Sequence, residues 1–369
     1  MITDILEKRG ARFLSAVCIA VVCGLLVLGL WPFHAPRNQV TWLGNENGLR
    51  FADAGTVVST GEFRMAPRDE PSCSIEVWVQ PGLAHDSNTL LAFYIPQDPL
   101  QFALRQSDTD LLLERDAGRG GRPARNGALY VNDVFRSMRP VFISISSGTQ
   151  GTAVYIDGVL ARSARRFLVT AGDCTGRLVV GTSPVGNDDW TGRFRGLAVY
   201  HSELTPSEVV RHYQTWTKAG RPEVSEGERC AALYLFAERG GNLVHNQIKP
   251  GVDLAIPERY QILDQTFLMP FWEEFDFGWG YGENALKNVV GFVPLGFFLY
   301  AYFLLKLPAR RAALVTVVLG CLVSVTIEVL QAYLPTRDSG TTDIITNTFG
   351  TWVGVVVYRR GRIGRALKT

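Results

Sequence analysis

Polar side chains of the kind found in binding and catalytic sites recur near the C-terminus, inside otherwise apolar segments. Ser324, Glu328 and Gln331 are spaced i, i+4 and i+7, which places them on one face of a helix. An ionisable group inside a membrane is costly and normally faces a helix bundle or a water-filled cavity. Glu328 is therefore a candidate for a general acid or base, or for a ligand-binding group.

A second set of polar residues follows at matching spacing. Asp343 and Asn347 lie four residues apart on one helical face, and Gly350 and Gly354 continue that face. Arg337 precedes them, and we expect its guanidinium to pair with one of the two carboxylates or to hold a phosphate. The alternative is that these residues only tie helices together, with the glycines allowing close backbone approach. The candidate binding residues are Asn288, Ser324, Glu328, Gln331, Arg337, Asp338, Asp343 and Asn347, and the catalytic candidates are Glu328 and Asp343.

Four apolar segments would position these side chains. Residues 13–31 form an uncharged run that, at 1.5 Å per residue, is about as long as the ~30 Å hydrocarbon core of a bilayer. Residues 288–305, 312–334 and 343–358 are the other segments, so we predict four transmembrane helices. A cleaved signal peptide is the alternative for 13–31, but the run is long for one and the Trp-Pro-Phe-His that follows is a poor cleavage site.

The charges predict how such helices would be oriented. The chain has 37 Lys and Arg against 35 Asp and Glu, so no nucleic-acid partner is expected. Basic residues cluster in 1–12, 306–311 and 359–368, which lie on one side of a membrane if there are four spans. Because basic segments stay in the cytoplasm, we predict a multi-pass protein of an inner (cytoplasmic) membrane with both termini cytoplasmic. The long middle region and the loop 335–342 would then lie outside.

The middle region has a different pattern. Between residues 40 and 265, short alternating runs are separated by turns rich in Gly, Asp and Pro. Asp157-Gly158 lies between two such runs, which is a strong signal for a β-hairpin. A short helix with a capping-box start is expected at 206–217. We predict a β-sandwich for this region.

Three segments of the middle region carry a family resemblance. SIEVWVQP (74–81), VYIDGVLARS (154–163) and GRLVVGTSPVGNDDWTGRFRGLAVYHSELTPSEV (176–209) resemble the laminin-G/concanavalin-like jelly-roll family. The resemblance implies a sandwich whose relatives bind sugars or proteins. Calcium is common in that family, and Asp188 and Asp189 would be its ligands here, with an ordinary turn as the alternative. No other cofactor is predicted.

The sandwich sequence does not favour glycan hydrolysis. Concanavalin-like glucanases use two nearby carboxylates, whereas Glu76 stands alone beside core positions of its strand. The five histidines show no metal-ligand spacing. We expect His201 beside a turn and His212 on a solvated face of the short helix.

The C-terminal motifs carry a second resemblance. N-x5-P-x-G from Asn288, S-x3-E-x2-Q from Ser324 and R-x5-D-x3-N-x2-G from Arg337 resemble the VanZ-like family, which is named for a membrane protein linked to teicoplanin resistance. The resemblance covers 284–358 and implies an association with the bacterial cell envelope. Residues 13–31 would be the family's first span, with the sandwich inserted after it.

The expected fold is therefore a membrane α-helical protein with four spans plus an all-β, concanavalin-like jelly roll, inserted between the first and second transmembrane helices. The predicted domains are a cytoplasmic N-terminus (1–12), a first span (13–31), the sandwich (40–265), an interfacial aromatic linker (266–283), a VanZ-like three-helix region (284–358) and a basic cytoplasmic tail (359–369). Cys73, Cys174 and Cys230 would lie outside the cytoplasm, where disulfides form. One pair is expected among the three, and the sequence does not choose it.

Two functions fit these observations. The first is a non-enzymatic envelope protein whose sandwich binds an extracytoplasmic glycan or envelope protein, while the helices recognise a membrane lipid, a lipid-linked glycan or a glycopeptide antibiotic. The second is a membrane enzyme that modifies a lipid-linked envelope glycan. A transporter is disfavoured because four spans lack the usual inverted repeat. We prefer the first, because no serine–histidine, metal or nucleotide motif supports an enzyme.

Overall fold

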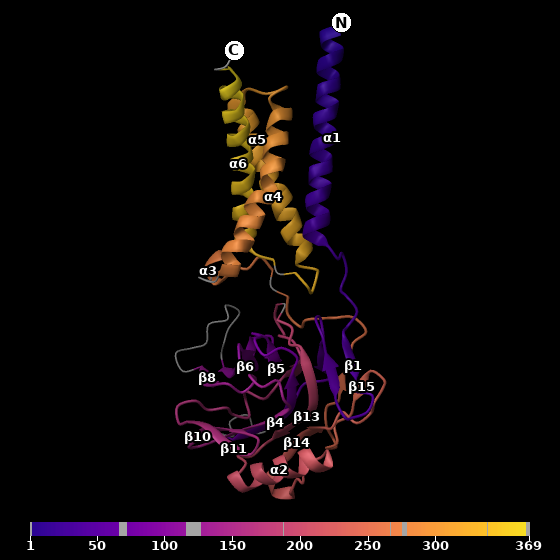
Figure 1. The fold of residues 1–369 in the computed structure, drawn as a ribbon, viewed down its shortest axis with the longest axis vertical. Helices are drawn as coiled ribbons and strands as arrows, with labels where there is room; N and C mark the ends of the chain where they lie inside the picture. The colour runs from indigo at the N-terminus through magenta and orange to yellow at the C-terminus, as the bar shows by residue number, and fades with distance from the viewer. Residues whose placement is uncertain are drawn as a thin grey trace. The chain divides into compact units, whose positions relative to one another are not determined.

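The computed structural model describes residues 2–65, 72–115, 127–186, 188–265, 267–274, 279–337 and 339–366. The chain divides into two compact units (Figure 1). The helical unit contains Met1–His34 and Gln265–Thr369, and the sandwich unit contains Ala35–Asp264. Each unit is described by itself.

The sandwich unit consists of two antiparallel sheets. The first sheet has the order β1 (Val40–Trp42), β2 (Leu49–Phe51), β13 (Gly192–Tyr200), β4 (Cys73–Pro81), β9 (Val141–Gly148), β10 (Gly151–Ile156) and β11 (Val159–Ala164), with β14 (Cys230–Tyr234) also paired to β13. The second has the order β15 (Leu243–Val244), β16 (Leu254–Ala255), β3 (Val57–Ser59), β12 (Arg177–Val180), β5 (Thr89–Ile95), β6 (Asp98–Ser107), β7 (Asp110–Arg115) and β8 (Ala128–Val131). The predicted all-β sandwich is confirmed.

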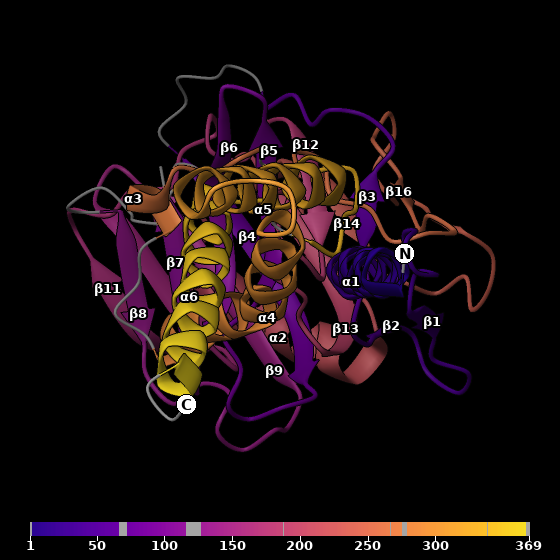
Figure 2. The same ribbon diagram turned by 90° about the horizontal axis from the view of Figure 1, so that it is seen from above.

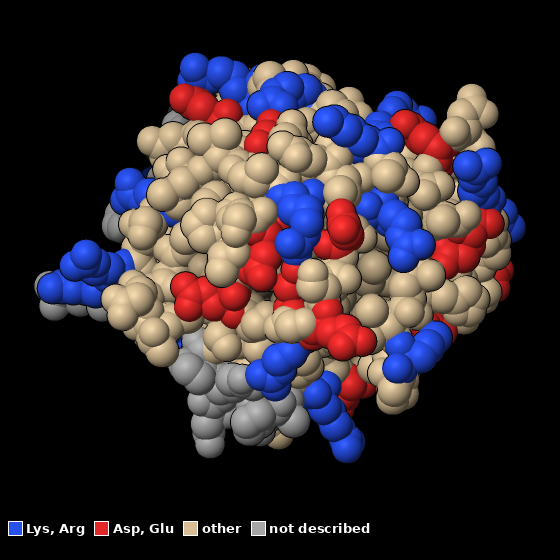
Figure 3. All heavy atoms as spheres, turned by 90° about the horizontal axis from the view of Figure 1, so that it is seen from below, with Lys and Arg blue, Asp and Glu red and all other residues tan. Residues whose placement is uncertain are grey.

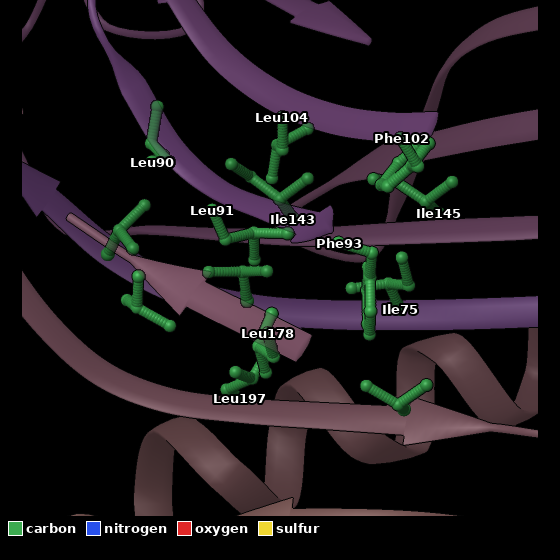
Figure 4. Close-up of a cluster of buried hydrophobic side chains, with 14 of the residues drawn as sticks. Ile75, Leu90, Leu91, Phe93, Phe102, Leu104, Ile143, Ile145, Leu178 and Leu197 are labelled. Atoms are coloured by element: carbon green, nitrogen blue, oxygen red, sulfur yellow. The ribbon is translucent and has the colours of Figure 1, made fainter. Parts of the chain in front are cut away.

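The core lies between the two sheets. Because successive side chains of a strand point to opposite faces, Ile75, Val77 and Val79 of β4 face the core and are fully buried. Figure 4 shows residues from both sheets meeting there. The labelled side chains are Ile75, Leu90, Leu91, Phe93, Phe102, Leu104, Ile143, Ile145, Leu178 and Leu197.

The predicted hairpin is present. Asp157 and Gly158 join β10 to β11 with φ of 52° and 79°, the left-handed pair that a two-residue hairpin turn requires. The sequence analysis named no strands between 89 and 131, where the structure has β5 to β8. Strands β5 and β7 are buried on both faces over much of their length, so they carry little polar alternation.

Helix α2 (Pro206–Ala219) covers part of the outer face of the first sheet. Thr205 caps its start with Glu208 in a capping box, as predicted. Trp216 is fully buried against Gly196 of β13, where a side chain on the glycine would overlap the indole ring. A 3₁₀ turn, η1 (Glu226–Glu228), follows the helix.

The helical unit has four long helices and a short one: α1 (Ile2–Leu30), α3 (Phe271–Glu274), α4 (Trp279–Phe303), α5 (Ala309–Gln331) and α6 (Thr341–Ala366). Helix α4 contacts α1, α5 and α6, and α5 contacts α1 and α6 (Figure 2). Three helices are long and apolar enough to cross a membrane, over Gly10–Leu30, Tyr281–Phe303 and Ala309–Gln331. Helix α6 carries Asp343 in its first turn and basic residues at its other end, so its crossing stays a prediction.

The predicted aromatic linker is only partly described. Phe267, Phe271 and Trp272 are exposed, whereas Phe275 and Phe277 lie outside the described residues. The backbone of Met269 forms a parallel bridge to Gly340 and accepts a hydrogen bond from the amide of Thr341 (2.9 Å). The linker is therefore tied to the start of α6.

Candidate functional site

The first polar set lies on one buried face of α5. Ser324, Glu328 and Gln331 follow the helical spacing, and all three side chains are buried in the helical unit. Other positions of α5 are exposed, and Leu314 is one that faces outward. The predicted face is therefore turned toward the other helices.

Hydrogen bonds join the candidate residues of α4, α5 and α6 across the helices. The amide of Asn347 on α6 donates to the hydroxyl of Ser324 at 3.0 Å. The amide of Asn288 on α4 donates to the carboxylate of Asp343 at 2.7 Å. Glu328 accepts a hydrogen bond from the backbone amide of Gly340 at 2.9 Å. The candidate residues of α4, α5 and α6 thus form one neighbourhood of cross-helix contacts.

Small residues bring these helices together. A Cβ on Gly350 or Gly354 of α6 would overlap the backbone of Val289 or Val293 on α4. Thr351, which the sequence analysis did not single out, is fully buried between glycines of α4 and α5. The two glycines of α6 therefore do allow close backbone approach.

In the described part of the chain, Arg337 does not form the expected ion pair with Glu328 or Asp343, and its role in holding a phosphate stays a prediction. Its guanidinium donates to the carbonyl oxygen of Trp31 at 2.7 and 3.3 Å. Gln331 similarly donates to the carbonyl oxygen of Gly29 at 2.9 Å. Carbonyls at the end of a helix lack intrahelical donors and favour cationic partners, so both side chains satisfy the end of α1.

Gln265 is a further residue that sequence reasoning missed. Its amide donates to the carbonyl oxygens of Gln331, Leu334 and Arg337 at 3.2, 2.5 and 3.3 Å. The Gln265 side chain thus caps carbonyl groups at the end of α5, as the Arg337 side chain caps a carbonyl group at the end of α1. No motif spacing could have identified it, because its acceptors are backbone atoms. Asp338 lies outside the described residues.

Two oxygens in this neighbourhood have no hydrogen-bond donor among the described residues. They are the side-chain carbonyl oxygens of Gln331 and Asn347, both buried. Burying an amide oxygen without a donor costs about 1–3 kcal/mol. These two oxygens are acceptors that hydroxyl or ammonium groups of a ligand could reach.

The sandwich unit contains a buried ionic cluster that the sequence analysis did not predict. His212 is wholly buried, not solvated, and its two ring nitrogens lie 3.0 Å from Glu76 and 2.9 Å from Glu228. Tyr200 donates to Glu76 at 2.8 Å, and Arg211 pairs with Glu228. Glu76 therefore does not stand alone.

The charge of His212 follows from these contacts. Burial by itself lowers the pKa of His212, but the hydrogen bonds and charges of Glu76 and Glu228 outweigh it, so the pKa is raised above its ordinary value. An imidazolium donates from both nitrogens, which matches two carboxylates on opposite sides. The cluster fastens α2 and η1 to the first sheet.

The calcium candidates already have partners. Asp188 contacts Thr89 at 2.5 Å and forms an ion pair with Arg105 at 3.1 Å. Asp189 accepts a hydrogen bond from the amide of Ala54 at 3.1 Å, and one of its oxygens has no donor. Across the described residues, no three His, Cys, Asp or Glu side chains are grouped to hold a metal ion. Calcium here stays a proposal.

The three outer cysteines are free thiols in the structure. Cys73 and Cys174 are both fully buried in the core, and their side chains lie close together. Burial raises the pKa of Cys174 well above its ordinary value. Cys230 belongs to a different hydrophobic cluster, beside α2. Cys73 and Cys174 are therefore the pair that a disulfide would join.

The two family resemblances are confirmed by family models. The concanavalin A-like lectin/glucanases superfamily matches residues 44–210, and VanZ/LLP1 matches residues 231–363. The chain thus combines a concanavalin-like domain with a VanZ-like region. The second match begins within β14, so it also includes the last strands of the sandwich unit. No curated protein sequence matches the chain.

Several solved structures are similar to the chain at low sequence identity. A Bacteroides ovatus protein described as carbohydrate-binding is 11% identical, with 60% of this chain and 63% of that chain covered and a TM-score of 0.40. A heptameric SAP-like pentraxin from Limulus polyphemus is 13% identical over 62% and 96%, with a TM-score of 0.35. The sialidase module CBM40 from Ruminococcus gnavus, bound to sialyllactose, is 12% identical over 45% and 95%, with a TM-score of 0.33.

Proposed function

We propose that this protein is a multi-pass membrane protein of the bacterial cell envelope that presents a glycan-binding sandwich outside the cytoplasm. Its helical unit would recognise a lipid, a lipid-linked glycan or a glycopeptide antibiotic through the polar neighbourhood of α4, α5 and α6. The observation that carries the proposal is the burial of Glu328 and Asn347 among helices apolar enough to span a membrane. Polar groups at such positions usually serve a function in membrane proteins.

The outward faces of the helices support the membrane assignment. Large apolar side chains are exposed on all four long helices, and large exposed apolar patches mark sites of membrane or protein interaction. The exposed residues are Phe13, Ile19, Leu28, Leu286, Val290, Leu314, Leu322, Phe349 and Trp352. A bilayer would cover them.

The charge distribution supports the proposed orientation. Basic residues flank the cytoplasmic ends of the proposed spans in 1–12, 306–311 and 359–368. Under the positive-inside rule both termini are cytoplasmic and the sandwich is outside. The sandwich unit lies in sequence between α1 and α4, so this orientation puts it where envelope glycans are found.

The buried carboxylates of the sandwich favour binding over hydrolysis. A glycosidase needs two carboxyl groups that reach the sugar, separated by about 5–10 Å. Glu76 and Glu228 lie on opposite sides of one histidine, but both are buried and both bind His212. They cannot act on a polysaccharide without dismantling the contact between α2 and the sheet.

The alternative function, a membrane enzyme acting on a lipid-linked glycan, rests on a different observation. The unpartnered oxygens of Gln331 and Asn347 lie near Glu328 in the network, and an acid with unsatisfied neighbours could transfer a proton to a bound substrate. An enzyme would consume its substrate, whereas a binding protein would not.

An envelope profile of a deletion strain separates the two. Lipids and lipid-linked glycans would be extracted from the strain lacking the protein and from the same strain complemented with the full chain. Accumulation of one lipid-linked precursor, reversed by complementation, would establish the enzyme and overturn the binding proposal. For binding, we expect an unchanged precursor pool and capture of envelope glycans by the full chain in neutral detergent. An absence of any glycan capture would contradict the sandwich's proposed role.

A further inference from the structure

The outer face of the first sheet carries a row of three polar residues, Arg50, Arg193 and Gln80, beside the area that α2 covers. Arg193 of β13 lies directly opposite Arg50 of β2 on one side and Gln80 of β4 on the other. Residues directly opposite on antiparallel strands share a face, with Cβ atoms about 5 Å apart. Two arginines therefore stand side by side on this face.

The row lines a cavity of about 460 Å³. That size falls in the range of about 300–1,000 Å³ that small-ligand sites occupy. Asp53, Leu83 and Met138 also line it, and the last two are 52% and 41% exposed. The cavity thus offers two cations, one carboxylate and two apolar side chains to a ligand.

The charges of the row are only partly compensated. Glu46 binds Arg195 at 2.6 and 2.9 Å and Arg193 more weakly at 3.4 Å. These hydrogen bonds, led by that with Arg195, lower the pKa of Glu46, so it stays charged. Arg50 has no hydrogen-bond or ion-pair partner among the described residues. Like charges directly opposite on neighbouring strands are destabilising, so the row would be stabilised by an added anion.

The second arginine of β13 keeps the site rigid. Arg195 lies over the ring of Trp78, 5.5 Å from its centroid, and donates to Gln80 at 3.4 Å. Gln80 in turn donates to the carbonyl oxygen of Met138 at 3.2 Å. These contacts hold one wall of the cavity in place without using the guanidinium of Arg50.

We propose that this cavity binds an acidic glycan, a saccharide whose sugar units carry carboxylate or phosphate groups. The guanidinium groups of Arg50 and Arg193 match the planar oxygen pairs of such anions. Asp53 accepts hydrogen bonds from sugar hydroxyls, and Leu83 and Met138 contact the apolar faces of the rings. This inference rests on the proposed glycan-binding function of the sandwich and specifies its ligand class.

Other described parts of the surface provide comparisons. The face shown in Figure 3 has Lys and Arg side chains interspersed with Asp and Glu on its described part. A second cavity of about 540 Å³ is lined by Arg64, Arg229 and Lys249 together with Glu62, and Lys249 is paired with Asp253 at 3.1 Å. Arg64 provides a matched control, because its loss removes the same charge from a different cavity.

The test uses the full chain in neutral detergent with fluorescent oligosaccharides. One probe is an oligogalacturonate, the second is its neutral methyl ester, and the third is an oligomannose carrying a phosphate monoester. We expect the chain to bind at least one charged probe about tenfold or more tightly than the neutral ester, with an affinity that falls as salt is added. Arg50→Gln and Arg193→Gln should each weaken that binding about tenfold or more, and Arg64→Gln should leave it unchanged. Whether the oligogalacturonate or the phosphorylated oligomannose binds shows whether the cavity recognises a carboxylate or a phosphate group.

The remaining outcomes separate this inference from the function on which it rests. Binding of the neutral ester as tightly as the charged probes, unaffected by either arginine variant, would overturn the acidic-ligand inference and leave glycan binding intact. An equal loss in Arg64→Gln would overturn the site, because net charge alone would then explain the affinity. Failure of the wild-type chain to bind any of the three probes would overturn the inference, and the capture of envelope glycans would then decide whether the sandwich binds glycans at all. Melting curves of each variant show whether the sandwich is folded.

Discussion

At the scale of single residues, the structure changes the roles that the sequence suggests for several polar side chains. Glu76 and His212 look unremarkable in sequence, since one follows a core position and the other lies on an amphipathic helix. In the structure both are wholly buried in one ionic cluster with Glu228. Such a cluster stabilises the folded sandwich only while each buried charge has a partner of opposite charge. The stability of the sandwich therefore depends on pH.

The stability of the sandwich should fall as pH rises through the pKa of His212. The pKa is raised in the folded state, so its contribution is complete below the unfolded value of about 6.5 and is lost as pH passes the folded value. We expect the melting temperature of the full chain in detergent, followed by circular dichroism of the β-sheet signal, to decrease over that range. In His212→Gln this dependence should disappear, and unfolding should be easier by about 3–5 kcal/mol in acid, because two buried carboxylates lose their partner.

His85→Gln is the matched control for this measurement. His85 also contacts a carboxylate, that of Asp108, but its side chain is 76% exposed. The variant should retain the wild-type pH dependence. A wild-type melting temperature that rises with pH over the same range, or a control that loses the dependence, would contradict the role given to His212.

Glu328 offers a second test at this scale. Glu328→Gln keeps the size of the side chain and one hydrogen-bond acceptor for the amide of Gly340 but removes the charge. If the residue only ties helices together, the change should cost less than about 1 kcal/mol, as intramembrane hydrogen bonds do on average. We instead expect the variant to accumulate at the normal level and fail to reverse the phenotype of the deletion strain. Full rescue at normal abundance would contradict a functional polar site.

At the scale of elements, α6 is the helix on which the polar neighbourhood depends. It is the most polar of the four long helices, yet it contacts both α4 and α5. Its glycines let the backbones approach until there is no room for a side chain between them. Packing between helices, more than the apolarity of α6 itself, therefore holds this helix in place.

Gly354→Leu should separate α6 from α4. The new side chain would have to displace the backbone around Val293, and interfaces built on small residues do not tolerate such bulk. We expect lower abundance and faster proteolysis of the helical unit in membranes, measured by immunoblotting after limited protease treatment. Gly291→Leu is the control, because a Cβ at Gly291 meets nothing within 4 Å, and it should behave as wild type. Equal sensitivity of the two variants would contradict the close packing.

At the scale of the whole molecule, the chain joins a folded β-sandwich to helices with membrane character. The two units have separate hydrophobic cores, and the chain passes from one to the other near residues 34 and 265. The orientation of the helices thus decides on which side of a membrane the sandwich lies.

Reporter fusions test that orientation. A reporter that is active only outside the cytoplasm should give signal when fused at residues 220 and 338, and none at residues 308 or after 360, because the basic segments hold those points inside. Protein abundance at each fusion provides the control. Signal after 360 would show that α6 does not cross, and the proposed polar site of α4, α5 and α6 would then have to be abandoned.

The sequence alone is sufficient wherever structure follows from local periodicity. The spacing of Ser324, Glu328 and Gln331 predicts a shared helical face, and that face is buried. The Asp157-Gly158 turn likewise predicts a hairpin, because only residues that tolerate positive φ fit it. Strands β5 and β7 escaped prediction because burial on both faces removes the alternation that marks a strand.

Only the tertiary structure could decide which distant groups meet. It places Arg337 on the end of α1 and away from a carboxylate, His212 between Glu76 and Glu228, and the thiol of Cys73 against that of Cys174. Each contact joins residues from separate elements, and many pairings of the same charges and thiols satisfy the sequence equally well. Packing of the two sheets and the four long helices selects one of them, because buried charges and hydrogen-bonding groups are stable only where partners are within reach.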